Sequence, residues 1–492
     1  MNFKIDIEFA ESAESLLNKL YYDNYLFDSG INKMSNSKDI LYNHRELFDI
    51  NIFKNLDSNK YSENEHEKIR LFKIFLSELL KTNNSFDSIE NLKNEFNIQT
   101  KKSDNKEMNL FNLFSNIKTE RKRENRKKLS QRYKELTDEF LAGIHLIIEN
   151  KNQTSKALGF NNYLDQTRDL NKIDIEQVKN LCKEFLNDTE YIYKDLFRWH
   201  LKNKLDIQIK DASYEDSLFL FNSFEFKDYF KQTSLLKLST QFLFEIGMNL
   251  SDSISFDLVN RASKNGQAKS YPAQIPDKIF VSIYRIKTIQ DYESILGELG
   301  KSLFFSSINV DETFENKRLI DPITLETFKI LFQDFVFEKK WLERYLKIDT
   351  DNNFIELLYL KKLAYLRNLC VNVLLFRIIN ENSSIYDSLS QISEIYLTNM
   401  FVKPNENTVL FDLVLSDINP YISYRAWLIE TNIKEFLRDK FDDQWWREPD
   451  TGNQLMKWWE MCSDLTGSKL EEIIGIKDIN NSKLISTFED IF

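Results

Sequence analysis

Glycine and proline are scarce in this chain, which has 10 Gly and 6 Pro among its 492 residues. These two residues force turns and interrupt helices more strongly than the others, so the chain has few enforced breaks. Apolar residues make up 42% of the sequence and aromatic residues 14%, which is enough to bury a substantial core. We therefore expect a mainly helical protein rather than a β-sandwich or a Rossmann-type sheet.

One stretch departs from the helical pattern. Pro272 and Pro276 exclude a helix interior between residues 266 and 284. Apolar side chains then recur at the two-residue period of a strand, in the run Ile279, Phe280, Val281, Ser282, Ile283, Tyr284. We predict a strand over residues 278–284, as part of one small sheet.

A helix is predicted directly after this strand, from Asp291 to Ile308, because apolar residues recur there at helical spacing without a proline. Its centre reads GELGK, from Gly297 to Lys301. With histidine at both of these positions it would read HELGH. That motif presents two imidazoles to a zinc ion and uses the Glu between them as general base. Here Glu298 is present and both histidines are missing.

A second predicted helix, from Asp321 to Phe332, carries Glu326. The 25 residues from position 301 to position 326 are enough for one helix to end and for a neighbour to return antiparallel to it. We therefore expect Glu326 beside the face that carries Gly297 and Lys301. Two helical histidines and a Glu from a downstream helix are the ligand set of one class of zinc peptidases.

Four segments, taken together in order and spacing, resemble the thimet oligopeptidase and oligoendopeptidase F family of zinc metallopeptidases. They are Ala157–Leu164 (ALGFNNYL), Arg261–Ile308, Arg318–Trp341 and Asp417–Gly475. The resemblance covers residues 145 to 476 and is weak or absent over the first hundred. It implies an N-terminal helical region at 1–145 and a peptidase-like helical domain at 146–492, with the strand 278–284 and the degenerate zinc helix 291–308.

The resemblance implies a zincin-like helical fold of two lobes around a deep central channel, with one small β-sheet beside the active-site helix. In the family, peptides lie along the edge strand of that sheet as an added strand. The resemblance places this edge at residues 278–284. The implied peptide-binding residues are Phe280, Ser282 and Tyr284.

The resemblance also assigns roles around the helix. Glu298 matches the general base, Glu326 matches the third zinc ligand, and Tyr421 and Tyr424 match the family's substrate-stabilising tyrosines. The two histidine ligands fall on Gly297 and Lys301. The histidines of this chain all lie at or before position 200: His44, His66, His145 and His200.

A single carboxylate without imidazoles is a poor zinc site, so we expect no cofactor, zinc being the ancestral metal. Two arrangements of the Lys301 side chain stay open. In one, its ammonium group pairs with Glu298 and Glu326, since unpaired buried charge is costly. In the other, the side chain extends into a wet channel.

These departures favour a catalytically inactive oligopeptidase-like protein, a pseudopeptidase, that binds a peptide or protein partner in its channel. Enzymatic activity is therefore not expected, although the implied fold is that of a metalloendopeptidase. Two alternatives stay open. One is a divergent metallopeptidase or other hydrolase with a non-zinc or metal-free carboxylate site. The other is a structural subunit in a complex with an active homologue.

Charge and cysteine usage bound the remaining possibilities. The net charge of −11 argues against nucleic acid as the main partner, and the one basic run, Arg121–Lys128, is interpreted as a solvated helix face in preference to an anion-binding patch. The three cysteines are far apart and form no CxxC pair.

The acidic start lacks a signal-peptide pattern, and the apolar stretch Leu369–Ile379 is too short to span a bilayer. We expect a cytoplasmic protein without a membrane partner.

Overall fold

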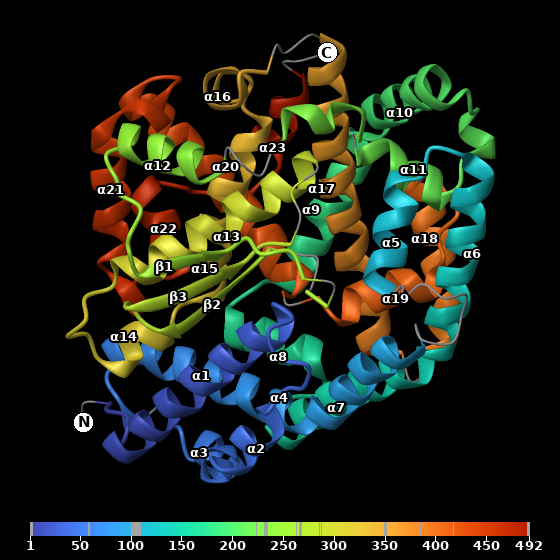
Figure 1. The fold of residues 1–492 in the computed structure, drawn as a ribbon. Coiled ribbons are helices and arrows are strands. Elements are labelled where there is room, and N and C mark those ends of the chain that lie inside the picture. Colours follow the sequence, from blue (N-terminus) through green and yellow to red (C-terminus); the bar gives the residue numbers. More distant parts are fainter. Residues whose placement is uncertain are drawn as a thin grey trace. The chain divides into compact units, whose positions relative to one another are not determined.

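The computed structural model describes residues 3–57, 60–99, 110–222, 224–230, 235–261, 263–264, 268–284, 286, 288–348, 352–382, 385–416 and 418–489. Helices form most of this part of the chain, and three short strands form a single sheet within it (Figure 1). The prediction of a mainly helical protein with one small sheet is confirmed.

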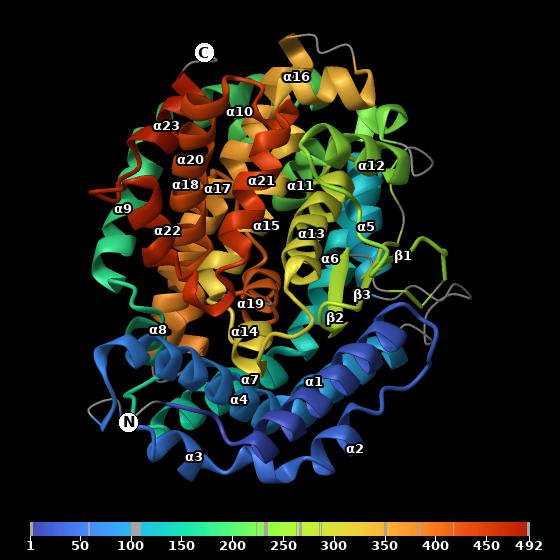
Figure 2. The same ribbon diagram turned by 90° about the vertical axis from the view of Figure 1, so that its left-hand side faces the viewer.

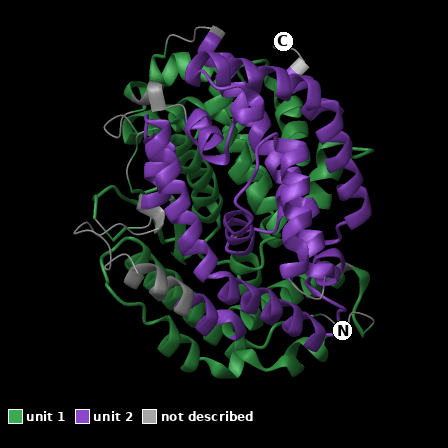
Figure 3. Cartoon of the chain, turned by 90° about the vertical axis from the view of Figure 1, so that its right-hand side faces the viewer, with its two compact units in different colours: residues 1–83, 226–350, 425–479 green, residues 84–225, 351–424, 480–492 purple. Residues whose placement is uncertain are grey.

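The chain divides into two compact units that are interleaved along the sequence (Figure 3). Unit 1 comprises residues 1–83, 226–350 and 425–479, and unit 2 comprises residues 84–225, 351–424 and 480–492. Residues 1–145 therefore contribute to both units. The expected boundary at residue 145 concerned similarity to a family, and it stays a prediction.

Unit 1 holds the sheet and the two helices that carry Glu298 and Glu326. Its strands are β1 (Ile254–Asp257), β2 (Lys269–Gln274) and β3 (Lys278–Ser282). Its helices are α1 (Ile7–Asp28), α2 (Ser37–Tyr42), α3 (Ile50–Lys54), α12 (Leu235–Glu245), α13 (Ile289–Ser307), α14 (Phe314–Arg318), α15 (Pro322–Gln333), α16 (Lys339–Trp341), α21 (Pro449–Trp459) and α22 (Gly467–Ile474). Two further helices, α4 (Glu63–Gln99) and α20 (Pro420–Phe441), contribute residues to both units.

The regular elements that the structure describes in unit 2 are all helices, apart from an isolated β-bridge between Ser213 and Lys403. Its helices are α5 (Leu110–Thr119), α6 (Arg123–Glu139), α7 (Leu141–Ala157), α8 (Tyr163–Asn171), α9 (Ile175–Asp188), α10 (Glu190–Leu205), α11 (Tyr214–Phe221), α17 (Asn352–Glu381), α18 (Leu389–Met400), α19 (Glu406–Val414) and α23 (Ser482–Glu489). One core cluster joins α5 to α6 through Leu113, Ile117 and Tyr133.

One stretch of α17, Asn353–Glu381, is long and apolar enough to cross a membrane, judged by length and composition alone. It extends well beyond the apolar stretch that we considered in the sequence. Of its most apolar window, 67% is buried inside the protein, and a buried core helix meets the same criterion. It is weak evidence for a membrane span.

The strand order in the sheet is β1-β3-β2 (Figures 1 and 2). β3 pairs with β1 in parallel on one side and with β2 in antiparallel on the other. The prediction that residues 278–284 form the edge strand is therefore wrong, because β3 is central and ends at Ser282. The strand beside α13 that has an outer edge is β2. Pro272 within it lacks an N–H, and proline is confined to edge positions for that reason.

The two faces of the sheet are covered by different helices of unit 1. On one face, the ring of Phe280 stacks on Tyr25 of α1, with the ring centroids 4.4 Å apart. On the other, Val281 and Ser270 are buried on the side of α13. The two-residue alternation of side chains in the sequence thus belongs to a strand that is covered on both faces.

The chain begins both site-bearing helices with good caps. At α13, Thr288 and Asp291 form a capping box, which is why the helix begins two residues before the predicted Asp291. At α15, Asp321 accepts hydrogen bonds from two backbone N–H groups of the first turn, and Pro322 occupies the first helical position. The predicted helix at 321–332 is thus found one residue further along.

Candidate functional site

Helices α13 and α15 pack closely against each other at Gly300. A Cβ atom at this position would lie 2.7 Å from Cδ2 of Phe332 and 2.8 Å from the backbone oxygen of Phe328. Only glycine permits this approach. The packing brings Glu326 beside the α13 face that carries Gly297 and Lys301, as the spacing predicted.

Glu298 is buried, with 6% of its surface exposed, and its carboxylate is bound on two sides. Its Oε2 atom accepts hydrogen bonds from the backbone N–H of Ser270 at 2.8 Å and from the Ser270 hydroxyl at 2.6 Å. The Nζ atom of Lys301, one turn further along α13, lies 3.6 Å from the same oxygen. The N–H of Ser270 points out of the sheet at the edge strand β2, so Glu298 satisfies a donor that would otherwise be unpaired.

The pKa of Glu298 lies below its ordinary value. Burial acts to raise it, but the positive charges of Lys301 and Lys329 and the two hydrogen bonds from Ser270 together outweigh the burial. The carboxylate is therefore ionised at neutral pH.

Glu326 is also buried, with 4% exposed, but its pKa is raised. Burial is the largest cause, and the negative charge of Glu298 adds to it, while Lys329 and Lys301 act in the opposite direction. The Nζ atom of Lys329 lies 3.3 Å from Oε2 of Glu326. The two glutamates share the same two lysines, but only Glu298 has the additional donors of Ser270.

Of the two arrangements left open for Lys301, the structure shows the ion pair, with one of the two carboxylates. Lys301 forms an ion pair with Glu298, whereas among the described residues the ion pair with Glu326 is made by Lys329. A direct Lys301–Glu326 ion pair is therefore not found among the described residues, although the charge of Lys301 still acts on Glu326. Lys301 and Lys329 have 24% and 27% of their side chains exposed, so both ammonium groups reach toward solvent.

Sequence reasoning missed Lys329 and Ser270. A signal for Lys329 was present, because each glutamate is followed three residues later by a lysine, a spacing at which helical side chains meet. Ser270 gave no such signal. Its role depends on the way in which β2 lies against α13, which no local pattern encodes.

The space beside Gly297 is filled from α15. A Cβ atom at position 297 would lie 3.2 Å from Cγ of Lys329 and 3.4 Å from Cβ of Gln333. Gln333 in turn donates a hydrogen bond to the buried Glu293 at 3.0 Å. An imidazole at 297 would therefore have to displace side chains that the interface already uses.

These residues do not fit a zinc ion. Zinc sites in proteins rely on nitrogen or sulfur donors, and the donors here are two carboxylates that are each paired with an ammonium group. Within the described ranges, no group of three or more His, Cys, Asp or Glu side chains is arranged to hold a metal ion.

The tyrosines that we matched to the family belong to unit 2. Tyr421 and Tyr424 are completely buried there. The Tyr424 hydroxyl donates a hydrogen bond to Oδ1 of Asn481 at 2.6 Å, and the Tyr421 ring packs against Phe376. Burial raises the pKa of both phenols. Their assignment to substrate binding stays a prediction.

The predicted peptide-binding residues lie on or just after β3, which has a strand on each side. Phe280 is stacked on α1, and Ser282 accepts a hydrogen bond from the Ser29 hydroxyl at 3.1 Å. A peptide strand therefore has no place beside β3. Whether these side chains or Tyr284 contact a peptide in another way stays a prediction.

The outer edge of β2 is capped by side chains of unit 1. Glu298 accepts a hydrogen bond from the backbone N–H of Ser270, and Arg318 donates one to the backbone oxygen of Pro272 at 2.9 Å. Arg318 is itself held by Glu14 and Asn18 of α1. Two of the backbone groups to which an added strand would bind are thus already engaged.

No family model matches the chain, and no curated protein matches it significantly.

Proposed function

We propose that this chain is a non-catalytic protein of the zincin-like, oligopeptidase type, a pseudopeptidase that binds a peptide or protein partner. The resemblance of four ordered segments to the thimet oligopeptidase and oligoendopeptidase F family supports the fold and the partner class. The state of Glu298 supports the loss of catalysis.

A general base must present a free lone pair to the proton that it removes, and its pKa should lie near the operating pH. Glu298 has a lowered pKa, and its Oε2 atom already accepts two hydrogen bonds and lies close to Lys301. It holds α13 to β2 and is a weak base at neutral pH. This single observation carries the inactive part of the proposal.

The charges of the cluster support the same reading. Two buried carboxylates inside these helices need compensating positive charge, because an uncompensated buried charge is costly. In the family that the sequence resembles, a metal ion would supply that charge. Here Lys301 and Lys329 supply it from the same two helices, and the Lys329 stem fills space beside Gly297.

The test combines metal content with cleavage. Purified protein is analysed for zinc by elemental analysis and is then incubated with a mixed peptide library, which is read by mass spectrometry. We expect no stoichiometric zinc and no new cleavage products, with or without a chelator. Cleavage that a chelator removes and that Glu298→Gln abolishes would overturn the proposal in favour of a divergent metallopeptidase. Chelator-resistant cleavage that Glu298→Gln abolishes would overturn it in favour of metal-free hydrolysis.

A reconstruction variant tests the same idea from the other direction. Gly297→His combined with Lys301→His restores the sequence motif, and we expect it to lower the melting temperature without yielding a zinc-dependent peptidase. Adding Lys329→Ala opens the space beside position 297. If the double variant alone binds stoichiometric zinc and cleaves peptides, the site has not been rebuilt around the lysines and this part of the proposal is wrong.

The binding half of the proposal needs its own measurement. The same peptide library is selected on immobilised wild-type protein, and bound peptides are eluted and identified. We expect a defined subset of peptides to be retained intact. Retention of none, at protein concentrations in the tens of micromolar, would contradict a peptide-binding role.

A further inference from the structure

The basic run in the sequence lies on α6 and the residues just before it, in unit 2. Between residues 120 and 135 there are eight Lys or Arg residues and three Glu, in a chain whose net charge is −11. In the sequence alone this run is most simply a solvated helix face. The structure separates it into two groups with different roles.

The first group is structural. Arg126 is buried, and its guanidinium binds Oδ1 of Asp216 at 2.7 Å as well as two backbone oxygens. Arg123 binds the other oxygen of Asp216 at 2.8 Å and the backbone oxygen of Asp211. These contacts fix α6 against α11 and the segment before it.

The second group has no such partners. Its members lie on or next to α6, and none forms an ion pair with a carboxylate within the described part of the chain: Arg121, Lys122, Lys127, Lys128, Arg132 and Lys134. Exposed lysines and arginines commonly pair with neighbouring acids, as Lys202 does with Asp206 on α10 and just after it. These six cations on or next to α6 are therefore not held at ion-pair distance by a carboxylate, although Glu124 and Glu135 lie on the same helix.

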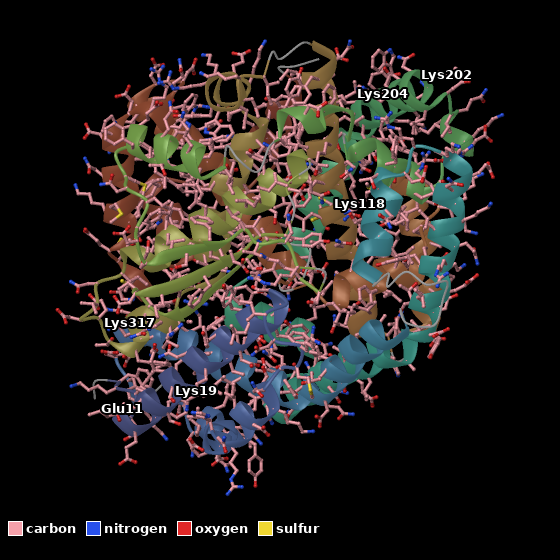
Figure 4. The ribbon with its side chains drawn as sticks, viewed as in Figure 1. Glu11, Lys19, Lys118, Lys202, Lys204 and Lys317 are labelled. Carbon is pink, nitrogen blue, oxygen red and sulfur yellow. The ribbon has the colours of Figure 1, made fainter. Side chains whose placement is uncertain are left out.

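Two open hollows meet at Lys127. One, of about 450 Å³, is lined by Arg123, Lys127, Lys202, Asp206, Ile207, Gln208 and Asp211. The other, of about 660 Å³, is lined by Glu124, Lys127, Lys128, Leu129, Gln131, Arg132 and Glu135. Lys202 and Lys204, labelled in Figure 4, lie in the last turn of α10. The surface thus combines Lys127, Lys128 and Arg132 with concave walls that include aliphatic carbon and several carboxylates.

We propose that this face of α6 docks an acidic peptide segment of a partner protein. From Lys127 to Lys134 the helix rises about 10 Å, which suits a row of carboxylates better than a single phosphate group. Leu129, which is partly exposed, gives one wall an aliphatic patch on which a peptide side chain can pack. This surface does not depend on the cluster of α13 and α15.

Two other polyanions fit less well. Single-stranded nucleic acid binds on aromatic platforms, and no aromatic side chain lines either hollow. Duplex nucleic acid and anionic membranes carry dense charge that acts over the Debye length, about 8 Å at physiological salt, so a chain of net charge −11 opposes their approach. A short peptide meets the local positive row with less of this opposition.

The experiment measures binding by fluorescence anisotropy at low salt, with the full chain and a labelled peptide of repeated Glu-Asp-Glu-Leu units. The variant is Lys127→Glu/Lys128→Glu/Arg132→Glu. The control is Lys156→Glu/Lys183→Glu/Lys237→Glu, which makes the same change in net charge at exposed lysines on other helices. We expect the first variant to weaken the Kd at least about tenfold and the control to change it less than about twofold. Circular dichroism verifies that both variants are folded.

Three results would overturn the proposal. The first is an absence of saturable binding by the wild type. The second is an equal loss in both triple variants, which would make the effect one of net charge. The third is tighter binding to single-stranded DNA or to phosphatidylserine vesicles than to the peptide, which would assign the surface to another class of partner.

Discussion

Ser270 donates both its backbone N–H and its hydroxyl to the same oxygen of Glu298, at 2.8 and 2.6 Å. The pair joins the edge strand β2 to α13 at the position where a peptidase helix would carry its general base. A carboxylate bound in this way acts as an internal support of unit 1. We therefore expect removal of this carboxylate to lower the stability of the folded protein.

Glu298→Gln should lower the free energy of unfolding by about 1–3 kcal/mol, because the amide loses the charge that Lys301 and Ser270 bind. Chemical denaturation at neutral pH measures this. Because the Glu298 pKa is lowered in the folded protein, its contribution is present above the unfolded pKa and is lost as the pH falls through the folded pKa. The difference in the free energy of unfolding between wild type and variant should thus shrink below about pH 4. A gap that is constant with pH would contradict the charge-based account.

Lys301→Met should also destabilise the protein, because Glu298 then loses its nearest cation. We expect about 1–3 kcal/mol at neutral pH. Lys329→Met is the matched variant at the second pair, and its effect should be smaller, since the raised pKa of Glu326 lets that carboxyl take up a proton instead. Thermal melts compare the two. An unchanged melting temperature for Lys301→Met would count against the pairing.

Gly300→Ala should cost about 1–3 kcal/mol through overpacking, because the new Cβ would meet the backbone oxygen of Phe328 at 2.8 Å. Gly297→Ala is the control on the same helix. Its Cβ would meet the flexible Lys329 side chain at 3.2 Å, and alanine favours the helix by about 1 kcal/mol over glycine, so the net change should be near zero. Equal losses at both positions would show that α13 and α15 do not approach most closely at Gly300.

Asp412→Asn tests a separate carboxyl, on α19 of unit 2. Although Asp412 is exposed, the protein around it raises its pKa to about 6, chiefly by desolvation, while Lys118 acts in the opposite direction. Burial is the main cause that raises the pKa of its neighbours Tyr133, Tyr214 and Tyr396, and the charge of Asp412 adds to it.

A raised carboxyl pKa gives stability that is present below the unfolded pKa, about 3.9, and that is lost as the pH rises through the folded pKa. Asparagine does not titrate. We therefore expect the variant to melt at a higher temperature than the wild type at pH 8, and expect the difference to vanish toward pH 4. A difference of the opposite sign at pH 8 would refute the raised pKa.

Helix positions were readable from the sequence because their signals are local. Apolar spacing located α13 within two residues, and Asp321 followed by a proline marked the start of α15. The distance between them was enough to predict that Glu326 would lie beside the α13 face that carries Gly297 and Lys301. These features depend on the chain within a few turns.

The errors concern partners that are distant in the sequence. Alternation identified β3 as a strand, but alternation does not reveal how many neighbours a strand has, and β3 proved central. Pro272 was the better signal for an edge, since it cannot donate to a ladder. Ser270 and Lys329 were missed because their roles arise only when β2 and α15 lie against α13.

The interleaving of the two units also has a consequence for synthesis. Any chain end between residues 84 and 479 divides both units, because unit 1 needs residues 425–479 and unit 2 needs residues 480–492. Domains that are continuous in sequence can fold one after another on the ribosome. Here neither unit has all of its residues until translation passes position 479, so the emerging chain must hold a large, incompletely packed apolar surface until then. We expect newly made protein to depend on chaperones to a degree that its helical, low-glycine sequence does not suggest.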